Sequence, residues 1–469
     1  MSIRHSAVEV LEARRLLSFP LGIGGTGTDV GVSIDSDPTG NVAVGGSYQG
    51  PVDFDPGAGT ASLDGSGGFV ARYAIDGTFL WARGFNGATV NKVAVDRSGN
   101  VYAAGTFSGV VDFDPRRTVL NISSSGAHDA FVVKLTPGGN LVFARTFGGA
   151  GEEVGTGLAV DTTGDIVVGG TFDTRADFNP GRGVFSIGNS GGADGYLVEL
   201  DNTGAFKWAG SFAGNNDETL TDVAIDLSGN VLATGRYDGT VDFDPSKSGV
   251  DNAVAATTQA YTVKWDTTGA LVWFAGFGGT GTTFGSAVAA DRAGNVYTTG
   301  GFSDTADFDP RAGTVNVIAP ATGAVFVSKL DPAGTFVFAD SIGGSTDVEV
   351  GPGEIGVDKS QNIYTTGQYS GTQDFDPGAG TSNLTSAGLN DVFVSKIDSN
   401  GAFVFAKSMG GTTEDRGIGE ALGYGNSILT TGSFTGTANF ATSGGPLNLT
   451  SNGDSDIFVS RLDANGAPL

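Results

Sequence analysis

One tetrapeptide, Asp-Phe-Asp-Pro, returns along the chain at nearly constant spacing and constrains the fold more than any other feature. Copies begin at residues 53, 112, 177, 242, 307 and 374, the third reading Asp-Phe-Asn-Pro, and a worn copy begins at residue 439. A glycine stands seven residues before each copy and a Tyr or Phe five residues before it, from Gly46 and Tyr48 to Gly432 and Phe434. The chain therefore contains seven related units of about 65 residues, and such a period indicates a repeat architecture.

Within each unit, apolar residues alternate with polar ones between Gly, Asp and Asn, which is typical of short antiparallel strands. In the third unit we expect strands over residues 157–161, 165–169, 195–200 and 205–209, the first two joined by the turn Asp161-Thr162-Thr163-Gly164. Four strands per unit without a helix predict an all-β fold, a seven-bladed β-propeller of four-stranded antiparallel blades.

The first strand of each unit has a small residue near its middle, which favours placing that strand at the crowded axis of the ring. These residues are Ser33, Ala94, Ala159, Ala224, Ala289, Gly356 and Ala421.

The two ends of the chain predict how the ring closes. The last unit has no fourth strand after residues 456–462, whereas residues 17–25 resemble the end of a fourth strand such as Phe147-Gly148-Gly149. We therefore expect the N-terminal segment to supply the outer strand of the last blade and to remove an open sheet edge. This divides the chain into a tail, residues 1–16, and a single propeller, residues 17–469.

Composition excludes several function classes. The chain has 25 Lys and Arg against 51 Asp and Glu, a net charge of −26, which argues against a nucleic-acid partner. It has no Cys and only two His, so thiolate catalysis and sites built on Cys or His ligands are not expected. No run of about 20 apolar residues predicts a membrane span.

The repeated tetrapeptides place two carboxylates two residues apart, a spacing that Ca²⁺ sites use. The candidate ligands are Asp53, Asp55, Asp112, Asp114, Asp242, Asp244, Asp307, Asp309, Asp374 and Asp376. A structural turn is the favoured interpretation, because Asn179, Asn439 and Ala441 interrupt the carboxylate pair in two units. No other cofactor is predicted.

Further acids stand in Gly-rich segments between units, such as Gly24-Gly25-Thr26-Gly27-Thr28-Asp29, and are weaker cation candidates. They are Asp29, Glu152, Glu153, Asp217, Glu218, Asp347, Glu349, Glu414 and Asp415. The string Gly188-Asn189-Ser190-Gly191-Gly192 fits the pattern of a nucleophile elbow, but no helix is expected after it and His128 belongs to another unit. Spacing alone singles out no acid pair for glycoside hydrolysis.

The order of motifs from Asp129-Ala130-Phe131-Val132-Val133-Lys134-Leu135 to Ala159-Val160-Asp161 resembles the bacterial SBBP β-propeller repeat. The resemblance covers roughly residues 19–469, and it departs from the family in its longer Asp-Phe-Asp-Pro segments. Residues 8–18 resemble the LEPR-XLL element of planctomycete surface proteins, with Ala13 where that motif has Pro.

These resemblances imply a protein exported to the exterior or surface of a bacterium, and they bring no catalytic residues with them. We expect a monomeric, non-enzymatic propeller for adhesion, scaffolding or recognition of a protein or polysaccharide ligand. A propeller-type hydrolase or lyase acting on polysaccharide is the alternative, and it requires an acid pair that breaks the repeat symmetry.

Overall fold

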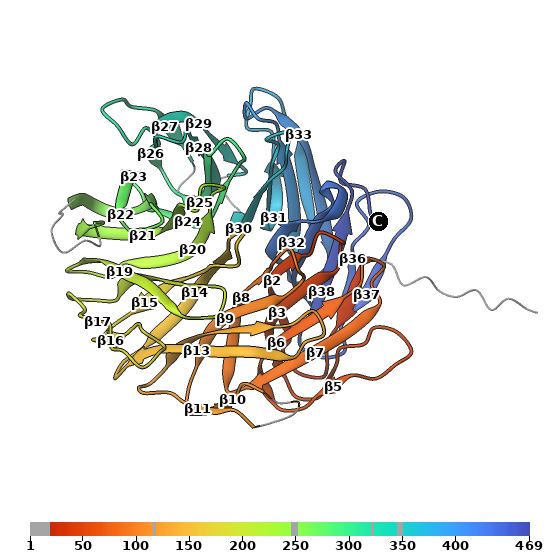
Figure 1. The fold of residues 1–469 in the computed structure, drawn as a ribbon. Helices are drawn as coiled ribbons and strands as arrows, with labels where there is room; N and C mark the ends of the chain where they lie inside the picture. Colours follow the sequence, from red (N-terminus) through yellow and green to blue (C-terminus); the bar gives the residue numbers. More distant parts are fainter. Residues whose placement is uncertain (1–18, 115, 117–118, 245–251, 320–322, 345–349) are drawn as a thin grey trace, which may run out of the picture.

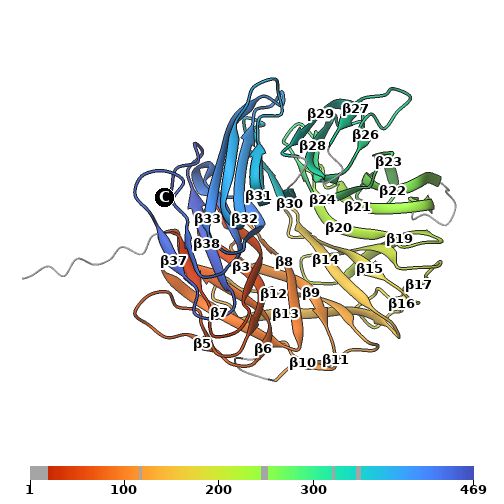
Figure 2. The ribbon, with the colours of Figure 1, turned by 180° about the vertical axis from the view of Figure 1, so that it is seen from behind.

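The structure is a computed structural model that describes the chain except residues 1–18, 115, 117–118, 245–251, 320–322 and 345–349. The predicted tail, residues 1–16, thus lies outside the described residues. The described part is all-β apart from one short turn of 3-10 helix, η1 (Tyr424–Asn426). Its antiparallel sheets follow one another around an axis, and the first strands of the chain lie beside the last (Figure 1, and from behind in Figure 2).

Each unit presents its strands in the same order from the axis outward. The innermost strands are β2 (Val30–Ser36), β8 (Ala88–Val95), β14 (Glu153–Val160), β20 (Thr219–Ile225), β24 (Thr283–Ala290), β30 (Val350–Val357) and β34 (Asp415–Leu422). The second strands are β3 (Val42–Gln49), β9 (Val101–Phe107), β15 (Ile166–Phe172), β21 (Val231–Asp242), β25 (Val296–Phe302), β31 (Ile363–Asp374) and β35 (Ile428–Phe434). The four strands predicted for the third unit are present, and each extends beyond its predicted bounds at one end.

The third strands are β6 (Ser66–Tyr73), β12 (Asp129–Leu135), β18 (Asp194–Leu200), β22 (Asn252–Trp265), β28 (Ala324–Leu330), β32 (Asn383–Ile397) and β38 (Asp456–Leu462). The outer strands are β7 (Phe79–Asn86), β13 (Leu141–Gly149), β19 (Phe206–Gly214), β23 (Leu271–Gly279), β29 (Phe336–Ile342), β33 (Phe403–Gly411) and β1 (Leu21–Ile23).

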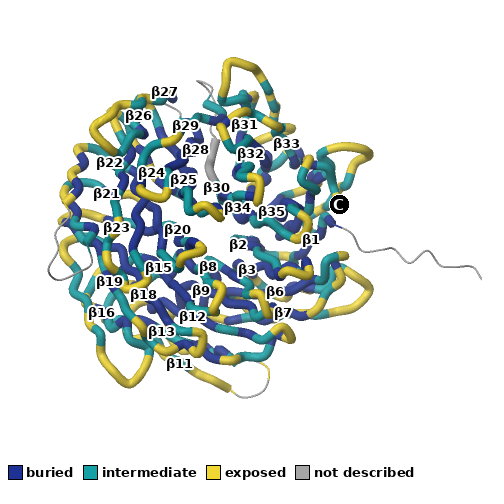
Figure 3. The backbone as a smooth tube through the Cα atoms, turned by 45° about the horizontal axis from the view of Figure 1, so that its top comes forward, coloured by how far each residue is buried: buried dark blue, intermediate teal, exposed yellow. Residues whose placement is uncertain are grey.

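The innermost strands pack against one another in chain order, and β34 packs against β2. Figure 3 shows β2, β8, β20, β30 and β34 around the centre. Every innermost strand has a β-bulge, as where the register with β15 shifts between Gly155 and Gly157. A bulge inserts one residue and bends the strand, which re-aims the side chains that follow it.

The repeat glycine is required by this bulge. A Cβ on Gly170 would lie 1.7 Å from the carbonyl oxygen of Val154, and one on Gly105 would lie 1.9 Å from that of Thr89. No side chain fits at such a distance, so the bulged inner strand and the second strand approach closely only where the second strand carries glycine.

The sheets are more complex than separate four-stranded blades. The segment between the second and third strands forms an extra hairpin, as separate short strands in five units and as extensions of β21–β22 and β31–β32 in the other two. The separate hairpins are β4 (Val52–Asp53) with β5 (Ser62–Leu63), β10 (Val110–Asp112) with β11 (Asn121–Ser123), β16 (Ala176–Asp177) with β17 (Ser186–Ile187), β26 (Thr305–Asp307) with β27 (Asn316–Ile318), and β36 (Thr437–Asn439) with β37 (Asn448–Thr450).

These hairpins link neighbouring units. β16 pairs with β13, β26 with β23 and β36 with β33, and β21 reaches β19 in the same way. Sheets of six and ten strands result. The prediction of purely four-stranded sheets was therefore wrong, because these short strands complete the outer edge of the preceding unit.

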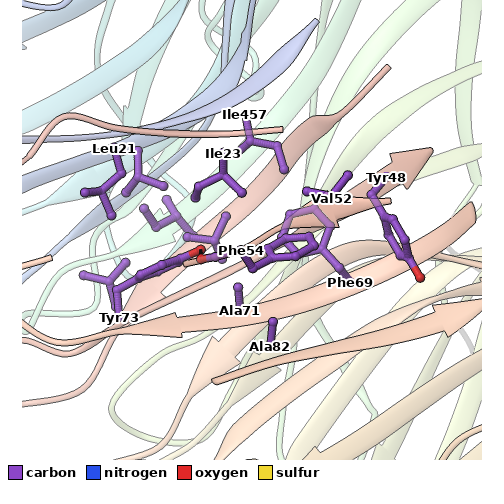
Figure 4. Close-up of a cluster of buried hydrophobic side chains, with 14 of the residues drawn as sticks. Leu21, Ile23, Tyr48, Val52, Phe54, Phe69, Ala71, Tyr73, Ala82 and Ile457 are labelled. Atoms are coloured by element: carbon purple, nitrogen blue, oxygen red, sulfur yellow. Dashed lines mark hydrogen bonds between the residues drawn. The ribbon is translucent and has the colours of Figure 1, made fainter. Parts of the chain in front are cut away.

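The N-terminal strand lies against the last unit. β1 pairs antiparallel with β38, with Leu21 opposite Val459 and Ile23 opposite Ile457. Leu21 and Ile23 are 2 % exposed and belong to a core that also contains Phe54, Phe69 and Ile457 (Figure 4). This core thus joins the first and last units.

Deleting residues 1–25 should lower the melting temperature of the whole protein, because it removes buried Leu21 and Ile23 and exposes the edge of β38. Deleting residues 1–14 is the matched control and should change little. The measurement is a thermal melt of both truncations, and an unchanged melting temperature for the longer deletion would contradict the role given to β1.

Candidate functional site

The first acid of each repeated tetrapeptide holds its own loop. One carboxylate oxygen of Asp112 accepts the N–H of Asp114 at 3.0 Å and the N–H of Leu120 at 2.8 Å. Equivalent pairs of bonds are made by Asp53, Asp177, Asp307, Asp374 and, in the worn copy, by Asn439. Since Asn makes the same bonds, the loop needs an oxygen acceptor at this position rather than a charge.

The second acids also accept backbone hydrogen bonds. Asp55, Asp309 and Asp376 each accept the N–H two residues further on, at 2.8 to 3.0 Å. In the fourth unit Asp242 accepts the N–H of Asp244 at 3.1 Å. Among the described residues, no group of three or more His, Cys, Asp or Glu side chains is arranged to hold a metal ion. Ca²⁺ binding by the ten repeat carboxylates stays a prediction.

The Phe of each tetrapeptide is at most 1 % exposed and packs between two other rings. Phe113 lies 5.3 Å from Phe107 and 5.0 Å from Phe131, measured between ring centroids. The same triads are Tyr48–Phe54–Phe69, Phe172–Phe178–Tyr196, Tyr237–Phe243–Tyr261, Phe302–Phe308–Phe326, Tyr369–Phe375–Phe393 and Phe434–Phe440–Phe458. Sequence reasoning missed the third ring, although it follows the tetrapeptide Phe by 18 residues in all units but the first.

Several acids between units are buried within their own loops. Glu153, Glu218 and Asp415 each accept the N–H of a glycine four residues earlier, at 2.7 to 2.8 Å. Asp29 does the same with Gly25 at 2.7 Å.

Their neighbours Glu152 and Asp217 are exposed and Glu414 is half-buried. The remaining candidates of this group, Asp347 and Glu349, lie outside the described residues.

Three innermost strands bring charged side chains together near the axis, which sequence reasoning missed. Lys92 Nζ on β8 lies 2.8 Å from Asp222 Oδ1 on β20 and 2.5 Å from Glu354 Oε1 on β30. Burial opposes the charge on Lys92, but the two carboxylates outweigh it and raise the pKa of Lys92. The available signal was a charge two residues before the small-residue position in these three units, where other units have Gly, Ala or Ser.

Two further acids lie on innermost strands beside this cluster. Glu420 on β34 is 8 % exposed, and neither of its carboxylate oxygens has a hydrogen-bond partner among the described residues. Burial, with a smaller contribution from the charge of Glu354, raises the pKa of Glu420 well above its usual range. Asp35 on β2 accepts the N–H of Val95 at 2.7 Å, and burial raises its pKa to about 6.

Asp35 also corrects the predicted alignment of the first unit. It pairs with Ala43 as Ala94 pairs with Tyr102 in the second unit, so Asp35 rather than Ser33 occupies the small-residue position. The turn that begins at Asp37 sets this register.

The contact between the first and last units carries a large cavity. A cavity of about 1070 Å³ is lined by Phe19 and β1, by the corner Pro56–Ala58, and by Leu447 and Leu449 in the hairpin of the last unit. The equivalent place between the first and second units, beside Trp81 and Arg116, is a cavity of about 370 Å³. The repeat symmetry is therefore broken at this seam.

The Gly-x-Ser-x-Gly string lies in the loop from β17 to β18, so a strand follows it where a nucleophile elbow needs a helix. Ser190 donates its N–H to Asp194 at 2.7 Å. His128 is paired with Glu152 at 3.2 Å on the surface.

Comparisons with known proteins agree with a propeller repeat. Residues 272–300 match the profile of the SBBP family, described as a beta-propeller repeat. The chain is 24% identical over 197 residues to an uncharacterized WD repeat-containing protein of Acanthamoeba polyphaga mimivirus, an alignment that covers 36% of this chain and 14% of the relative. It is 26% identical over 197 residues to the regulatory protein FlaEY of Caulobacter vibrioides, an alignment that covers 40% of this chain and 20% of the relative. The chain thus spans a fifth or less of the length of these relatives.

Solved structures similar to this chain include the Dos1 propeller, with a TM-score of 0.44 at 11% identity over 94% of this chain and 95% of that one. Sqt1 from Chaetomium thermophilum has a TM-score of 0.39 at 13% identity, over 88% and 97% of the two chains. No helix in the described part of this chain is long and apolar enough to cross a membrane.

Phe113→Ala should lower the free energy of unfolding by about 3–5 kcal/mol, because it opens a cavity inside a closed aromatic triad. Asp112→Asn is the matched control in the same loop and should cost far less, since Asn439 makes the equivalent bonds. Denaturant unfolding of both variants measures this. A neutral Phe113→Ala beside a severe Asp112→Asn would make the loop an ion site instead of an aromatic corner.

Lys92→Met should destabilise the protein by about 3–5 kcal/mol at pH 8, because Asp222 and Glu354 then lack their counter-ion in a largely buried site. Adding Asp222→Asn and Glu354→Gln to Lys92→Met should restore most of this loss. Unfolding of the single and triple variants at pH 5 and pH 8 provides the comparison. A loss of equal size at both pH values would contradict the electrostatic explanation, since burial raises the pKa of Glu354 to about 7 and its protonation at pH 5 relieves part of the unpaired charge.

Proposed function

We propose that this protein is a non-enzymatic, seven-bladed propeller that recognises a protein or polysaccharide ligand outside the cell. In this proposal each repeat unit is one blade, and β1 is the outer strand of the seventh. The packing of β34 against β2 and the pairing of β1 with β38 support a closed ring.

The widened cavity at the seam is the observation that carries ligand recognition. Its volume of about 1070 Å³ is slightly above the range of about 300–1,000 Å³ for small-molecule sites, which leaves room for an oligosaccharide. Its lining combines apolar Phe19 and Leu449 with the polar side chains of Asn448 and Asn452. Such a mixed lining suits a sugar, which offers both apolar ring faces and hydroxyl groups.

Export to the bacterial surface is supported by the resemblance to SBBP repeats and, in residues 8–18, to the LEPR-XLL element. The high negative charge keeps such a protein soluble and monomeric, in keeping with a single-chain propeller.

A polysaccharide hydrolase or lyase is the second candidate, and the axial acids favour it. The charge of Glu354 adds to the effect of burial in raising the pKa of Glu420, and burial raises the pKa of Glu354 to about 7. A carboxyl that stays protonated near neutral pH beside an ionised one is the arrangement of a general acid with its partner. Binding of Glu354 to Lys92 weighs against a free catalytic carboxylate.

A glycan array followed by hydrolysis assays on every bound polysaccharide tests both candidates. We expect saturable binding without cleavage, and Ala58→Trp, at an exposed position on the rim of the seam cavity, should weaken it by placing an indole ring in the cavity mouth. Ala379→Trp places the same side chain at the exposed equivalent position of the sixth unit and should leave binding unchanged.

Equal loss of binding in the Ala58→Trp and Ala379→Trp variants would contradict the seam site. Cleavage that Glu420→Gln abolishes would establish the hydrolase instead.

A further inference from the structure

Acids meet in pairs where one unit packs against the next. One member belongs to the third strand of a unit, and the other is the first residue of the innermost strand of the following unit or directly precedes it. The pairs are Asp129 with Glu153, Asp194 with Glu218, Asp391 with Asp415, and Asp456 with Asp29. All eight residues are 0 to 2 % exposed. Backbone bonds align three of these junctions, as where Glu218 donates its N–H to the Ala193 carbonyl at 2.7 Å.

Each acid uses an oxygen on its own loop and leaves the pair short of donors. Asp194 Oδ2 accepts the N–H of Ser190, and Glu218 Oε2 accepts that of Gly214 at 2.8 Å. Asp194 Oδ1 and Glu218 Oε1 are fully buried and receive no donor from elsewhere in the described chain. In each of the other three pairs one carboxyl oxygen is likewise buried without a hydrogen-bond donor among the described residues. These oxygens belong to Glu153, Asp391 and Asp456.

The residue types at the two facing positions of a junction are correlated: both are acids or both are neutral. In the remaining three units the register places neutral residues at both positions: Gly67 with Ala88, Gln259 with Thr283, and Ala324 with Val350. An acid at one position is never combined with a neutral residue at the other. If the acids served only their own loops, mixed pairs would be expected. Something held between the two carboxyl groups explains why they occur together.

We propose that each pair holds one shared proton, so that a carboxylic acid donates a hydrogen bond to a carboxylate across the junction between units. Two carboxylates have no proton with which to bond each other, so Asp194 Oδ1 and Glu218 Oε1 would both be left without a donor if both groups were ionised. One proton satisfies both buried oxygens and leaves one negative charge where there would be two.

Burial acts in the same direction. It raises the pKa of Glu218 to about 8, of Glu153 and Asp415 to about 7, and of Asp194 and Asp456 to about 6. The titratable groups facing the pairs are mostly acids, which add to the shift. Asp238 faces Glu218, Asp173 and Glu152 face Glu153, and Glu414 faces Asp415.

The basic side chains near the pairs are engaged elsewhere, since His128 is bonded to Glu152 and Arg416 to Glu414. Tyr196 and Tyr261 also lie near Glu153 and Glu218, and burial raises the pKa of both phenols, which keeps them protonated.

A divalent cation fits this site less well. Ca²⁺ takes six to eight oxygen ligands, whereas the two facing carboxyl groups offer few and their burial excludes the waters that would complete the shell.

The shared proton makes the junctions sensitive to pH. Because the folded pKa values lie above those of unfolded Asp and Glu, the folded protein binds more protons between about pH 4 and pH 8. The stabilising contribution is thus fully present below the unfolded pKa and is lost as pH rises through the folded values. The ring should be less stable at pH 8.5 than at pH 5.5.

Thermal melts of the EDTA-treated full chain and of Glu218→Gln across this pH range test the proposal. The amide that Glu218→Gln introduces donates to Asp194 at every pH, so we expect the melting temperature of this variant to fall less steeply with pH and to exceed that of the unmodified protein at pH 8.5. Glu153→Gln gives the same test at a second junction if Glu218→Gln does not fold. Asp64→Asn, which removes an exposed charge from the first unit, where the paired positions are Gly67 and Ala88, is the control and should keep the original slope.

Infrared spectroscopy gives an independent readout. The absorption of protonated carboxyl groups should persist at neutral pH and decrease in a Glu153→Gln, Glu218→Gln double variant. A slope that is unchanged in both single variants would overturn the proposal. Recovery of stability at pH 8.5 with CaCl₂, but not with NaCl of equal ionic strength, that Glu218→Gln abolishes would also overturn it and identify a calcium site.

Discussion

The burial of one phenylalanine per unit between two other aromatic rings is the interaction on which the rest of the structure depends. The Phe113 ring holds the turn of the hairpin β10–β11, and Asp112, the last residue of β10, closes the loop beside it. In four units the first strand of this hairpin, or the corresponding extension, pairs with the outer strand of the preceding unit. The packing within one unit therefore determines the contact between two.

The repetition also restricts where a single functional site can lie. A repeated corner produces equivalent surfaces around the ring, so a single binding or catalytic site requires a departure from the repeat. Two departures are present. At the axis, Lys92, Asp222 and Glu354 replace the uncharged residues of other units. At the seam, a cavity about three times larger than its counterpart lies beside β1. The axial charges neutralise one another in part, whereas the seam cavity is open, which favours the seam for a ligand.

Much of the fold was predictable because the repeat supplies several copies of each signal. The four main strands of the third unit follow from alternation and turn residues, and the burial of Phe178 follows from its recurrence. The short hairpins were missed because strands of two or three residues, such as β16, carry too little alternation to recognise. The axial cluster was missed because its members lie far apart in the chain, and only the ring brings Lys92 within reach of Glu354.

The proposed shared protons and the proposed ligand site meet at the seam. Asp456 lines the cavity and also pairs with Asp29 across the contact between the last and first units. The outer strand there, β1, is three residues long, whereas β13 has nine, so fewer backbone hydrogen bonds hold β1 to its sheet. Loss of the proton would place two buried charges beside this short strand. Because Asp456 belongs both to the acid pair and to the cavity wall, a change in the protonation of the pair must also alter the cavity.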